Sequence, residues 1–177
     1  MDGFIAPPDG SVDWLSPFDG GDAFEGDDEH SYRAFYASVD AVVMGRRTYE
    51  KVLGFGAWPY AGKPCWVCAR RGGVPVQSDV VLTAAPPAEV MAQVAARGCQ
   101  RAWMVGGGRL ASAFAAAGLV TELIVSAIPV LLGGGTLLFD PPAPRATLRL
   151  TDSHDFGDGI VRWRYAAAPA GAAAAHD

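Results

Sequence analysis

Two arginines, Arg46 and Arg47, follow a short apolar run and a glycine in the segment VVMGRRTYE, residues 42–50. The run from Ala41 to Met44 predicts a buried strand, and Thr48 to Leu53 predicts a short helix with its first residue near the cap. A helix start presents free backbone N–H groups that bind anions, and arginine binds phosphate oxygens through two parallel hydrogen bonds. The segment therefore predicts a phosphate site, while the alternative is a capped helix with two arginines in solvent.

A second pair of arginines, Arg70 and Arg71, follows the apolar run CWVCA in the same way. Ligands of open α/β sheets bind beyond the carboxyl ends of parallel strands, so the two pairs are expected at one edge of the sheet. The whole chain has a net charge of −5, which makes this gathering of positive charge a local feature. It favours a phosphorylated ligand over arginines that only decorate the surface.

A third segment of this kind is MVGGGRLASAF, residues 104–114. Ala102 to Val105 predicts a strand, Gly106 to Gly108 a turn, and Leu110 to Ala117 a helix. Glycines let the backbone approach a phosphate closely, although they also suit a simple tight turn. The segment contains G-x-G-x-x-A, but the dinucleotide fold carries it on the first strand with an acid about 20 residues later, where this chain reads SAIPVLL. Arginines in place of that acid favour NADP over NAD.

The remaining pattern places these three segments on one α/β sheet. Helices are expected at residues 30–38 and 87–97, and further strands at 80–82, 123–129, 148–151 and 160–165. Strands alternate with helices in the middle and two strands close the chain, so the sheet is expected to be mostly parallel, with helices on both faces and an antiparallel C-terminal edge. One domain is expected over residues 1–166, followed by a low-complexity tail at 167–177.

Composition and charge exclude several classes of protein. The net charge of −5 argues against a nucleic-acid binder, which needs a basic surface. No apolar run is long enough to cross a membrane, and the odd count of three cysteines favours a cytoplasmic protein. Cys65 and Cys68 lie in one predicted strand and point to opposite faces, so they are expected to be buried apolar residues and not a disulfide or metal site.

Five segments together resemble the dihydrofolate reductase superfamily, and within it the proteins related to the C-terminal reductase domain of bacterial RibD. They are MDGFIA, DWL, VVMGRRTYE, MVGGGRL and TELIVSAIPVLLGGGTLLF, between Met1 and about Tyr165. The resemblance implies a dihydrofolate-reductase-like three-layer fold and an NADPH-dependent reductase. Its substrate would be a small heterocycle, pterin- or dihydrofolate-like, or 5-amino-6-(5-phosphoribosylamino)uracil-like as in riboflavin biosynthesis. Family habit also implies a homodimer, associated through residues 121–130.

The resemblance assigns roles to residues of the matching segments. It implies that the cofactor phosphates bind at Gly45, Arg46, Arg47 and Thr48. It places the 2′-phosphate between Arg70 and Arg71, the pyrophosphate at Gly106, Gly107, Gly108, Arg109 and Leu110, and the nicotinamide beside Ile5 and Ala6. The candidate catalytic residues are Asp2, Trp14 and Glu29, with Trp14 near the substrate, and Asp19 and Asp28 stay open as alternative proton sources.

The sequence departs from the family's pattern at two places. The family carries a full strand before the DGFIA motif, where this chain has only Met1, so the first strand is expected to be truncated in the sequence as given. Proteins of the RibD type usually carry glutamate at the position of Gly106, which puts riboflavin-pathway chemistry in question. A second hypothesis is therefore an NADP(H)-binding module of the same fold without catalysis. A third is a structural protein whose glycines only form turns.

Overall fold

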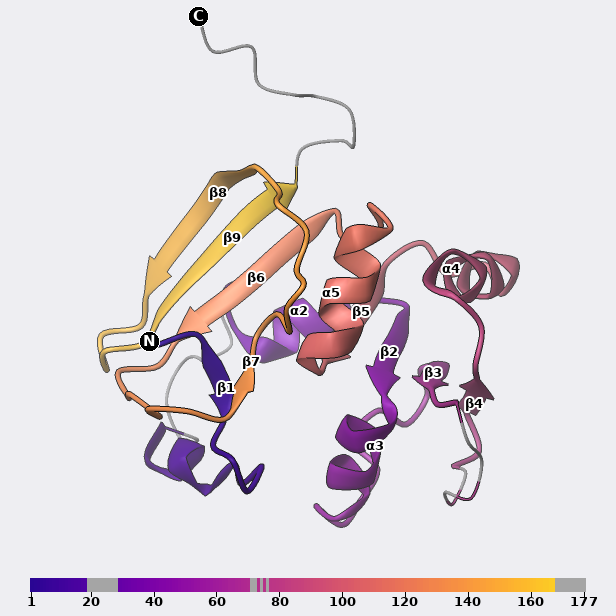
Figure 1. Cartoon of the computed structure of the whole chain (residues 1–177), viewed down its shortest axis with the longest axis horizontal. Coiled ribbons are helices and arrows are strands. Elements are labelled where there is room, and N and C mark those ends of the chain that lie inside the picture. The colour runs from indigo at the N-terminus through magenta and orange to yellow at the C-terminus, as the bar shows by residue number, and fades with distance from the viewer. Residues whose placement is uncertain (19–28, 71–72, 74, 76, 168–177) are drawn as a thin grey trace, which may run out of the picture.

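The computed structural model describes residues 1–18, 29–70, 73, 75 and 77–167. Four parallel strands form its main sheet in the order β4-β3-β2-β5, and three antiparallel strands form a second sheet in the order β6-β9-β8 (Figure 1). A short antiparallel pair, β1 with β7, lies apart from both. The expected class, a mostly parallel α/β sheet with an antiparallel C-terminal edge, is confirmed.

The elements between residues 30 and 127 and those from residue 148 onward lie close to their expected places, whereas the sequence predicted no element at Phe4–Ala6, Asp13–Phe18 or Thr136–Leu137. In chain order they are β1 (Phe4–Ala6), the 3₁₀ helix η1 (Asp13–Phe18), α2 (Tyr32–Ala37), β2 (Ala41–Gly45), α3 (Arg46–Leu53), β3 (Cys65–Cys68), β4 (Val80–Thr83), α4 (Pro87–Ala96), β5 (Ala102–Gly106), α5 (Gly108–Ala116), β6 (Glu122–Ala127), β7 (Thr136–Leu137), β8 (Leu148–Asp155) and β9 (Val161–Ala167). β8 continues past the expected end at Thr151, because its pairing with β9 absorbs an irregularity between Leu150 and Asp152.

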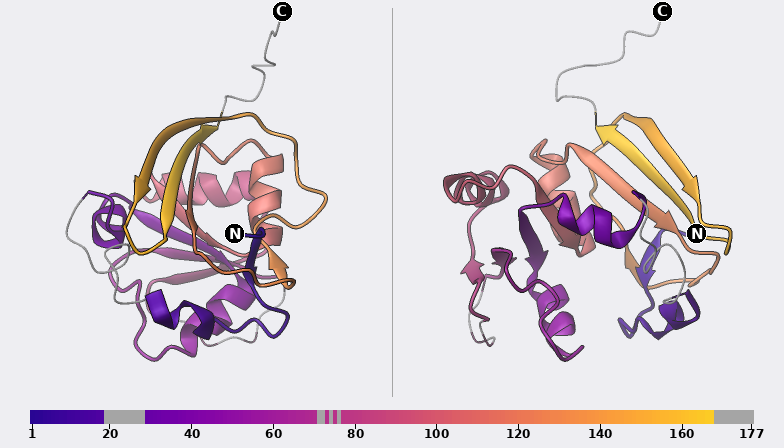
Figure 2. Two further views of the ribbon diagram at one scale, coloured as in Figure 1. Left: turned by 90° about the vertical axis from the view of Figure 1, so that its left-hand side faces the viewer. Right: turned by 180° about the vertical axis from the view of Figure 1, so that it is seen from behind.

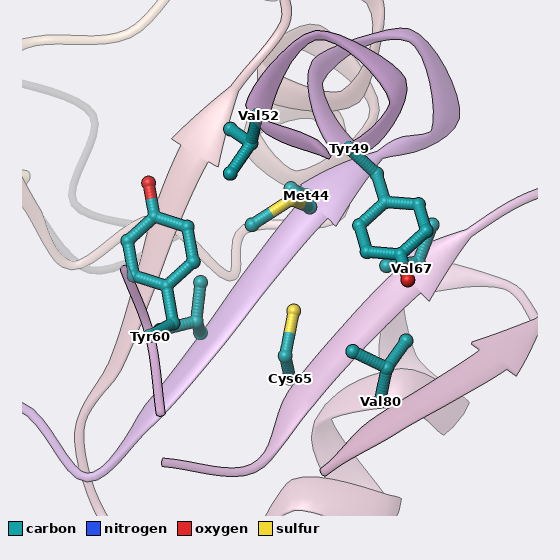
Figure 3. Close-up of a cluster of buried hydrophobic side chains, with 8 residues drawn as sticks. Met44, Tyr49, Val52, Tyr60, Cys65, Val67 and Val80 are labelled. Carbon is teal, nitrogen blue, oxygen red and sulfur yellow. The ribbon is translucent and has the colours of Figure 1, made fainter. Parts of the chain in front are cut away.

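The parallel sheet is covered on both faces because its strands alternate between two apolar clusters. Val42 and Met44 of β2 belong to the cluster under α3, whereas Ala41 and Val43 belong to the cluster under α4 and α5. All four side chains are at most 1% exposed, as expected for a central parallel strand between two layers of helices. Figure 3 shows the first cluster, in which side chains of α3 pack over β2 and β3.

Cys65 and Cys68 face opposite sides of β3, as the sequence predicts, although Cys68 is only half-buried. Cys65 is fully buried in the first cluster, Cys68 packs against the second, and the thiols are free. Burial raises the pKa of the Cys65 thiol to about 12, so this group stays protonated at neutral pH. Among the described residues no group of three metal-binding side chains occurs. The same part of the chain holds no helix with the length and apolar character to span a membrane.

Candidate active site

The carboxyl ends of two neighbouring strands meet at the edge of the parallel sheet. β2 and β5 are paired with Met44 opposite Gly106, so both strands end in a glycine at this edge. α3 begins directly after Gly45 and α5 directly after Gly107, and neither helix has a side-chain cap. The first N–H groups of a helix have no partner within it, so two sets of backbone donors lie beside each other here.

The two glycine turns are in close contact. A Cβ added at Gly45 would lie 3.7 Å from the Gly106 carbonyl oxygen and 3.9 Å from the Gly107 nitrogen, and one at Gly107 would lie 3.8 Å from the Thr48 hydroxyl oxygen. Gly106 has a φ of +132°, which L side chains rarely adopt, and its peptide bond to Gly107 is cis. Gly45, Gly106 and Gly107 are all half-buried, so a ligand can reach their backbone.

The expectation that Thr48 lies near the helix cap is wrong. β2 runs into α3 without a linker, so Gly45 is the cap and Thr48 is the third residue of the helix. The displacement brings the Thr48 hydroxyl beside the Gly107 backbone, where the two turns meet. The Thr48 hydroxyl therefore lies at the junction of the two turns.

The arginines at this edge differ in what they already bind. The Arg46 side chain donates from Nε to the Glu50 carboxylate at 2.8 Å. Arg47 is exposed and makes no ion pair with any residue that the structure describes. Arg70 is also exposed and lies two residues past Cys68, which is paired with Gly45. Arg71 lies outside the described residues.

The residues after the glycine turn face different surroundings. The Arg109 side chain is 91% exposed, and its Nε lies 3.3 Å from the Asp140 carboxylate. The Leu110 side chain packs against the cluster under α4 and α5, and its N–H donates to the Gly107 carbonyl at 2.9 Å. Of this pair, Arg109 is therefore the one whose side chain can reach a ligand.

The short strand β7 holds β1 near the glycine turn at the start of α5. Gly135, directly before β7, approaches β1 so closely that a Cβ would lie 2.0 Å from the Ala6 carbonyl oxygen. Gly108 at the start of α5 approaches β7 in the same way, since a Cβ added there would lie 2.3 Å from the Leu137 carbonyl oxygen. The expected nicotinamide residues, Ile5 and Ala6, are thus connected to the glycine turn through β7.

The Asp2 carboxylate holds the glycine-rich loop before β7. Its Oδ2 accepts the Gly133 N–H at 2.7 Å, and this bond is the main reason that the pKa of the Asp2 carboxyl lies below its ordinary value. Its Oδ1 is buried without a hydrogen-bond partner among the described residues. Asp2 therefore has a positioning contact, which the sequence does not signal because the two residues are 131 positions apart.

Replacing Asp2 with asparagine is expected to lower the melting temperature at neutral pH and to flatten its acid dependence. A carboxyl whose pKa is lower in the folded state stabilises that state above its unfolded pKa, and this contribution disappears as the pH falls through the folded pKa. Melting curves of both proteins from pH 7 to about pH 2 should therefore converge at the acid end. Parallel curves would contradict this role of the carboxylate.

The other two candidate catalytic residues lie apart from the glycine turns. Trp14 on η1 packs against the cluster of Ile128 and Ile160, and its indole N–H is buried without a partner in the described part of the chain. Glu29 is exposed in the turn that precedes α2. Asp19 and Asp28, the alternative acids, lie outside the described residues.

A cluster of aromatic side chains beside β5 was not expected from the sequence. Trp103 of β5 is surrounded by Phe35 and Tyr36 of α2 and by Tyr60, with ring centroids 5.2 to 6.4 Å apart. The Tyr36 hydroxyl is buried without a partner among the described residues, and burial raises its pKa. The sequence indicated only that aromatic residues of α2 recur at helical spacing. Their partners, Trp103 and Tyr60, lie in distant segments of the chain and could not be predicted.

The four-stranded parallel sheet, its antiparallel extension and the helices on both faces define a dihydrofolate-reductase-like α/β protein. The chain belongs to the RibD C-terminal domain family, whose model matches residues 1–162. The uncharacterized protein YwjB of Bacillus subtilis (strain 168) is 34% identical over 162 residues, which cover 90% of this chain and 89% of YwjB.

Solved structures share the fold. A candidate riboflavin biosynthesis protein from Shewanella sp. PV-4 is 28% identical with a TM-score of 0.81, and the match covers 95% of this chain and 94% of that one. The diaminohydroxyphosphoribosylaminopyrimidine deaminase/5-amino-6-(5-phosphoribosylamino)uracil reductase of Thermotoga maritima is 13% identical with a TM-score of 0.65. That match covers 95% of this chain and 54% of the Thermotoga chain, so it shows the fold alone.

Proposed function

We propose that this protein is an NADPH-dependent reductase that transfers hydride to a small heterocycle, either pterin- or dihydrofolate-like or 5-amino-6-(5-phosphoribosylamino)uracil-like. The observation that carries the proposal is the adjacent pair of uncapped helix starts at Gly45 and Gly107, with arginines at the same sheet edge. Such an edge suits a dinucleotide, whose phosphates need several N–H donors and positive charges. Membership of a family named for the reductase domain of RibD supports the proposal.

The residues present fit this cofactor. The N–H groups that open α3 and α5 face the edge where Gly45, Gly106 and Gly107 leave no side chain in the way, so they suit the pyrophosphate. Arg46 is engaged by Glu50, which makes Arg47 and Arg70 the better candidates for the 2′-phosphate. Arg71 lies outside the described residues, and it stays in the proposal because the resemblance assigns it to the 2′-phosphate.

The substrate side of the site would lie between β1 and η1. The cofactor supplies the hydride when bound, and the chain orients it and the substrate. Ile5 and Ala6 would flank the reacting ring, because β7 connects β1 to the start of α5. The Trp14 indole N–H is a buried donor that a heterocyclic acceptor could satisfy.

The test is NADPH oxidation by the purified protein in the presence of dihydrofolate or of 5-amino-6-(5-phosphoribosylamino)uracil. Absorbance of the reduced nicotinamide follows the reaction, with NADH and a substrate-free sample as controls. Oxidation of NADPH that requires one of the two compounds is the expected result. Failure to bind NADPH would overturn the proposal.

A second candidate function is an NADP(H)-binding module without catalysis. The observation that favours it is the state of the two candidate acids: the Asp2 carboxylate binds the Gly133 N–H, and Glu29 is exposed to solvent. Neither Asp2 nor Glu29 is therefore held in a position to donate a proton to the substrate. NADPH binding without turnover of any pterin or pyrimidine would support this function and exclude the reductase.

We further propose that the protein is a cytoplasmic homodimer. The resemblance implies contact through residues 121–130, which include β6. The outermost strand of the same sheet, β8, carries two exposed leucines, Leu148 at 39% and Leu150 at 51%, which a second copy could also cover. Light scattering during size-exclusion chromatography measures the mass in solution. A monomer at all concentrations would contradict the proposal.

A further inference from the structure

One tyrosine in the cluster under α3 combines a buried ring with a hydroxyl that has no partner. Tyr60 is only 6% exposed, and its hydroxyl makes no hydrogen bond with any residue that the structure describes. The Tyr36 hydroxyl and the Trp58 indole N–H also lack partners there, but those two atoms are sealed from solvent, whereas the Tyr60 oxygen is not. Tyr60 therefore presents an accessible hydroxyl at the tip of an otherwise buried ring, and such a group requires a hydrogen-bond partner from outside the chain.

The Tyr60 hydroxyl points toward the carboxyl ends of the parallel strands. Figure 3 shows it on the side of the cluster where Met44 lies, and away from Cys65 and Val80. Cys65 and Val80 are the paired first residues of β3 and β4. Met44 is paired with Gly106 of the glycine turn, at the other end of the sheet. The hydroxyl is therefore directed toward the same edge of the sheet as the candidate site.

Neighbouring rings hold Tyr60 in this orientation. Trp58 and Trp103 pack edge-on against it, with ring centroids 5.1 and 5.7 Å away and interplanar angles of 86° and 82°. Tyr36 of α2, which lies behind the parallel sheet in Figure 1 and in front in the right-hand view of Figure 2, packs 6.3 Å away. Burial raises the pKa of the Tyr60 hydroxyl far above its ordinary value, so the group is a neutral donor at physiological pH. The ring and its donor are thus fixed before any ligand arrives.

The last turn of α3 connects this cluster with the segment that follows β1. Val52 of that turn packs in the cluster with Tyr60. The pKa of the Asp9 carboxyl, beyond β1, lies below its ordinary value mainly because Ser11 donates to it, and also because of the positive charge of Lys51, the neighbour of Val52. The segment after β1 therefore lies near the turn of α3 that covers Tyr60.

We propose that the Tyr60 hydroxyl contacts the heterocyclic substrate and donates a hydrogen bond to an acceptor atom of its ring, a carbonyl oxygen or an unprotonated ring nitrogen. This inference rests on the proposed function, which places the substrate ring beside β1. A fixed donor at this position orients the ring and stabilises negative charge that develops on the acceptor atom during reduction. The hydroxyl keeps its proton throughout, so its role is to bind and polarise the ring and not to supply the proton of the product.

The test compares two variants that each remove one hydroxyl from the same cluster. Tyr60→Phe removes the accessible hydroxyl, and Tyr49→Phe removes a hydroxyl that donates to the Pro75 carbonyl at 2.7 Å. Figure 3 shows the Tyr49 hydroxyl directed toward Val80, away from the carboxyl ends of the strands, so this variant is the matched control. Isothermal titration calorimetry measures the binding of dihydrofolate and of 5-amino-6-(5-phosphoribosylamino)uracil, each with and without NADP⁺.

The two variants are expected to separate ligand binding from stability. Tyr60→Phe should raise the Kd of the compound that binds about fivefold or more, because one hydrogen bond is lost, and it should shift the melting temperature by less than about 2 °C. Tyr49→Phe loses a bond within the protein, so it should lower the melting temperature by several degrees and leave the Kd within about twofold.

Three results would overturn the proposal. The first is an unchanged Kd in Tyr60→Phe, and the second is equal weakening of binding by the two variants, which would assign the effect to the cluster as a whole. The third is a failure of both compounds to bind the unmodified protein under either condition. Binding of a compound without oxidation of NADPH would exclude the reductase activity alone, because the Kd comparison still decides whether the Tyr60 hydroxyl contacts the ring.

Discussion

Replacing Arg47 and Arg70 together with glutamine is expected to raise the Kd for NADPH about a hundredfold or more, and to change the Kd for NADH less than about threefold. A hydrogen bond from a guanidinium to a phosphate contributes about 1.5–3 kcal/mol, and about 1.4 kcal/mol is a factor of ten in affinity. NADH lacks the 2′-phosphate, so it cannot lose these bonds. Both side chains are exposed, so the substitutions should leave the fold intact. Isothermal titration calorimetry measures both nucleotides.

A matched control separates local contacts from overall charge. Arg145, before β8, and Arg149, in β8, are exposed arginines of the antiparallel part of the molecule. The variant R145Q/R149Q therefore makes the same change in net charge away from the glycine turns. This variant should bind NADPH within about threefold of the unmodified protein at physiological salt, where charges beyond about 8 Å are screened. Equal weakening by both double variants would contradict the assignment, as would equal weakening of NADPH and NADH by R47Q/R70Q.

Replacing Gly135 with alanine is expected to lower the free energy of unfolding by about 3 kcal/mol or more. Its φ of +127° is strained for any L side chain, and the added Cβ would lie 2.0 Å from the Ala6 carbonyl oxygen and 2.7 Å from the Pro7 carbonyl carbon. The obstacles are backbone atoms of β1 and its extension, so a rotamer change cannot relieve the contact. For a domain of this size the loss corresponds to about 6–12 °C in melting temperature.

The neighbouring glycine provides the control. A Cβ added at Gly134 meets no atom within 4 Å, so Gly134→Ala should change stability by less than about 0.5 kcal/mol. Chemical denaturation of both variants measures the difference. If the two variants were equally stable, the close approach of this loop to β1 would be wrong, and with it the connection between β1 and the start of α5.

The glycine turns could be predicted because their signal is local. An apolar run, a glycine and an amphipathic helix follow one another within about ten residues, and this order indicates a strand, a turn and an uncapped helix start. The relation between Gly45 and Gly106 also follows, since parallel strands place their carboxyl ends at one edge. The starts of both helices were placed too late: α3 begins at Arg46 and not at Thr48, and α5 begins at Gly108 and not at Leu110. Nothing in the sequence marks where each strand passes into its helix.

The contacts that connect the site to the rest of the molecule could not be predicted, because they join residues far apart in the chain. The Asp2 carboxylate meets the Gly133 N–H, and the Tyr49 hydroxyl donates to the Pro75 carbonyl at 2.7 Å. β7 is only two residues long, so it gives no periodic pattern of its own. The aromatic packing around Trp103 likewise depends on tertiary arrangement.

The most direct test of the proposed cofactor site is the melting temperature of the purified protein with and without NADPH, with NADH at the same concentration as the control. A ligand that binds only the folded state stabilises it by about 2.7 kcal/mol at a concentration of 100 times its Kd. For this chain length the account predicts a rise of about 5–10 °C with NADPH and a clearly smaller rise with NADH. No rise with either nucleotide would contradict the assignment of the two glycine turns and their arginines to NADPH.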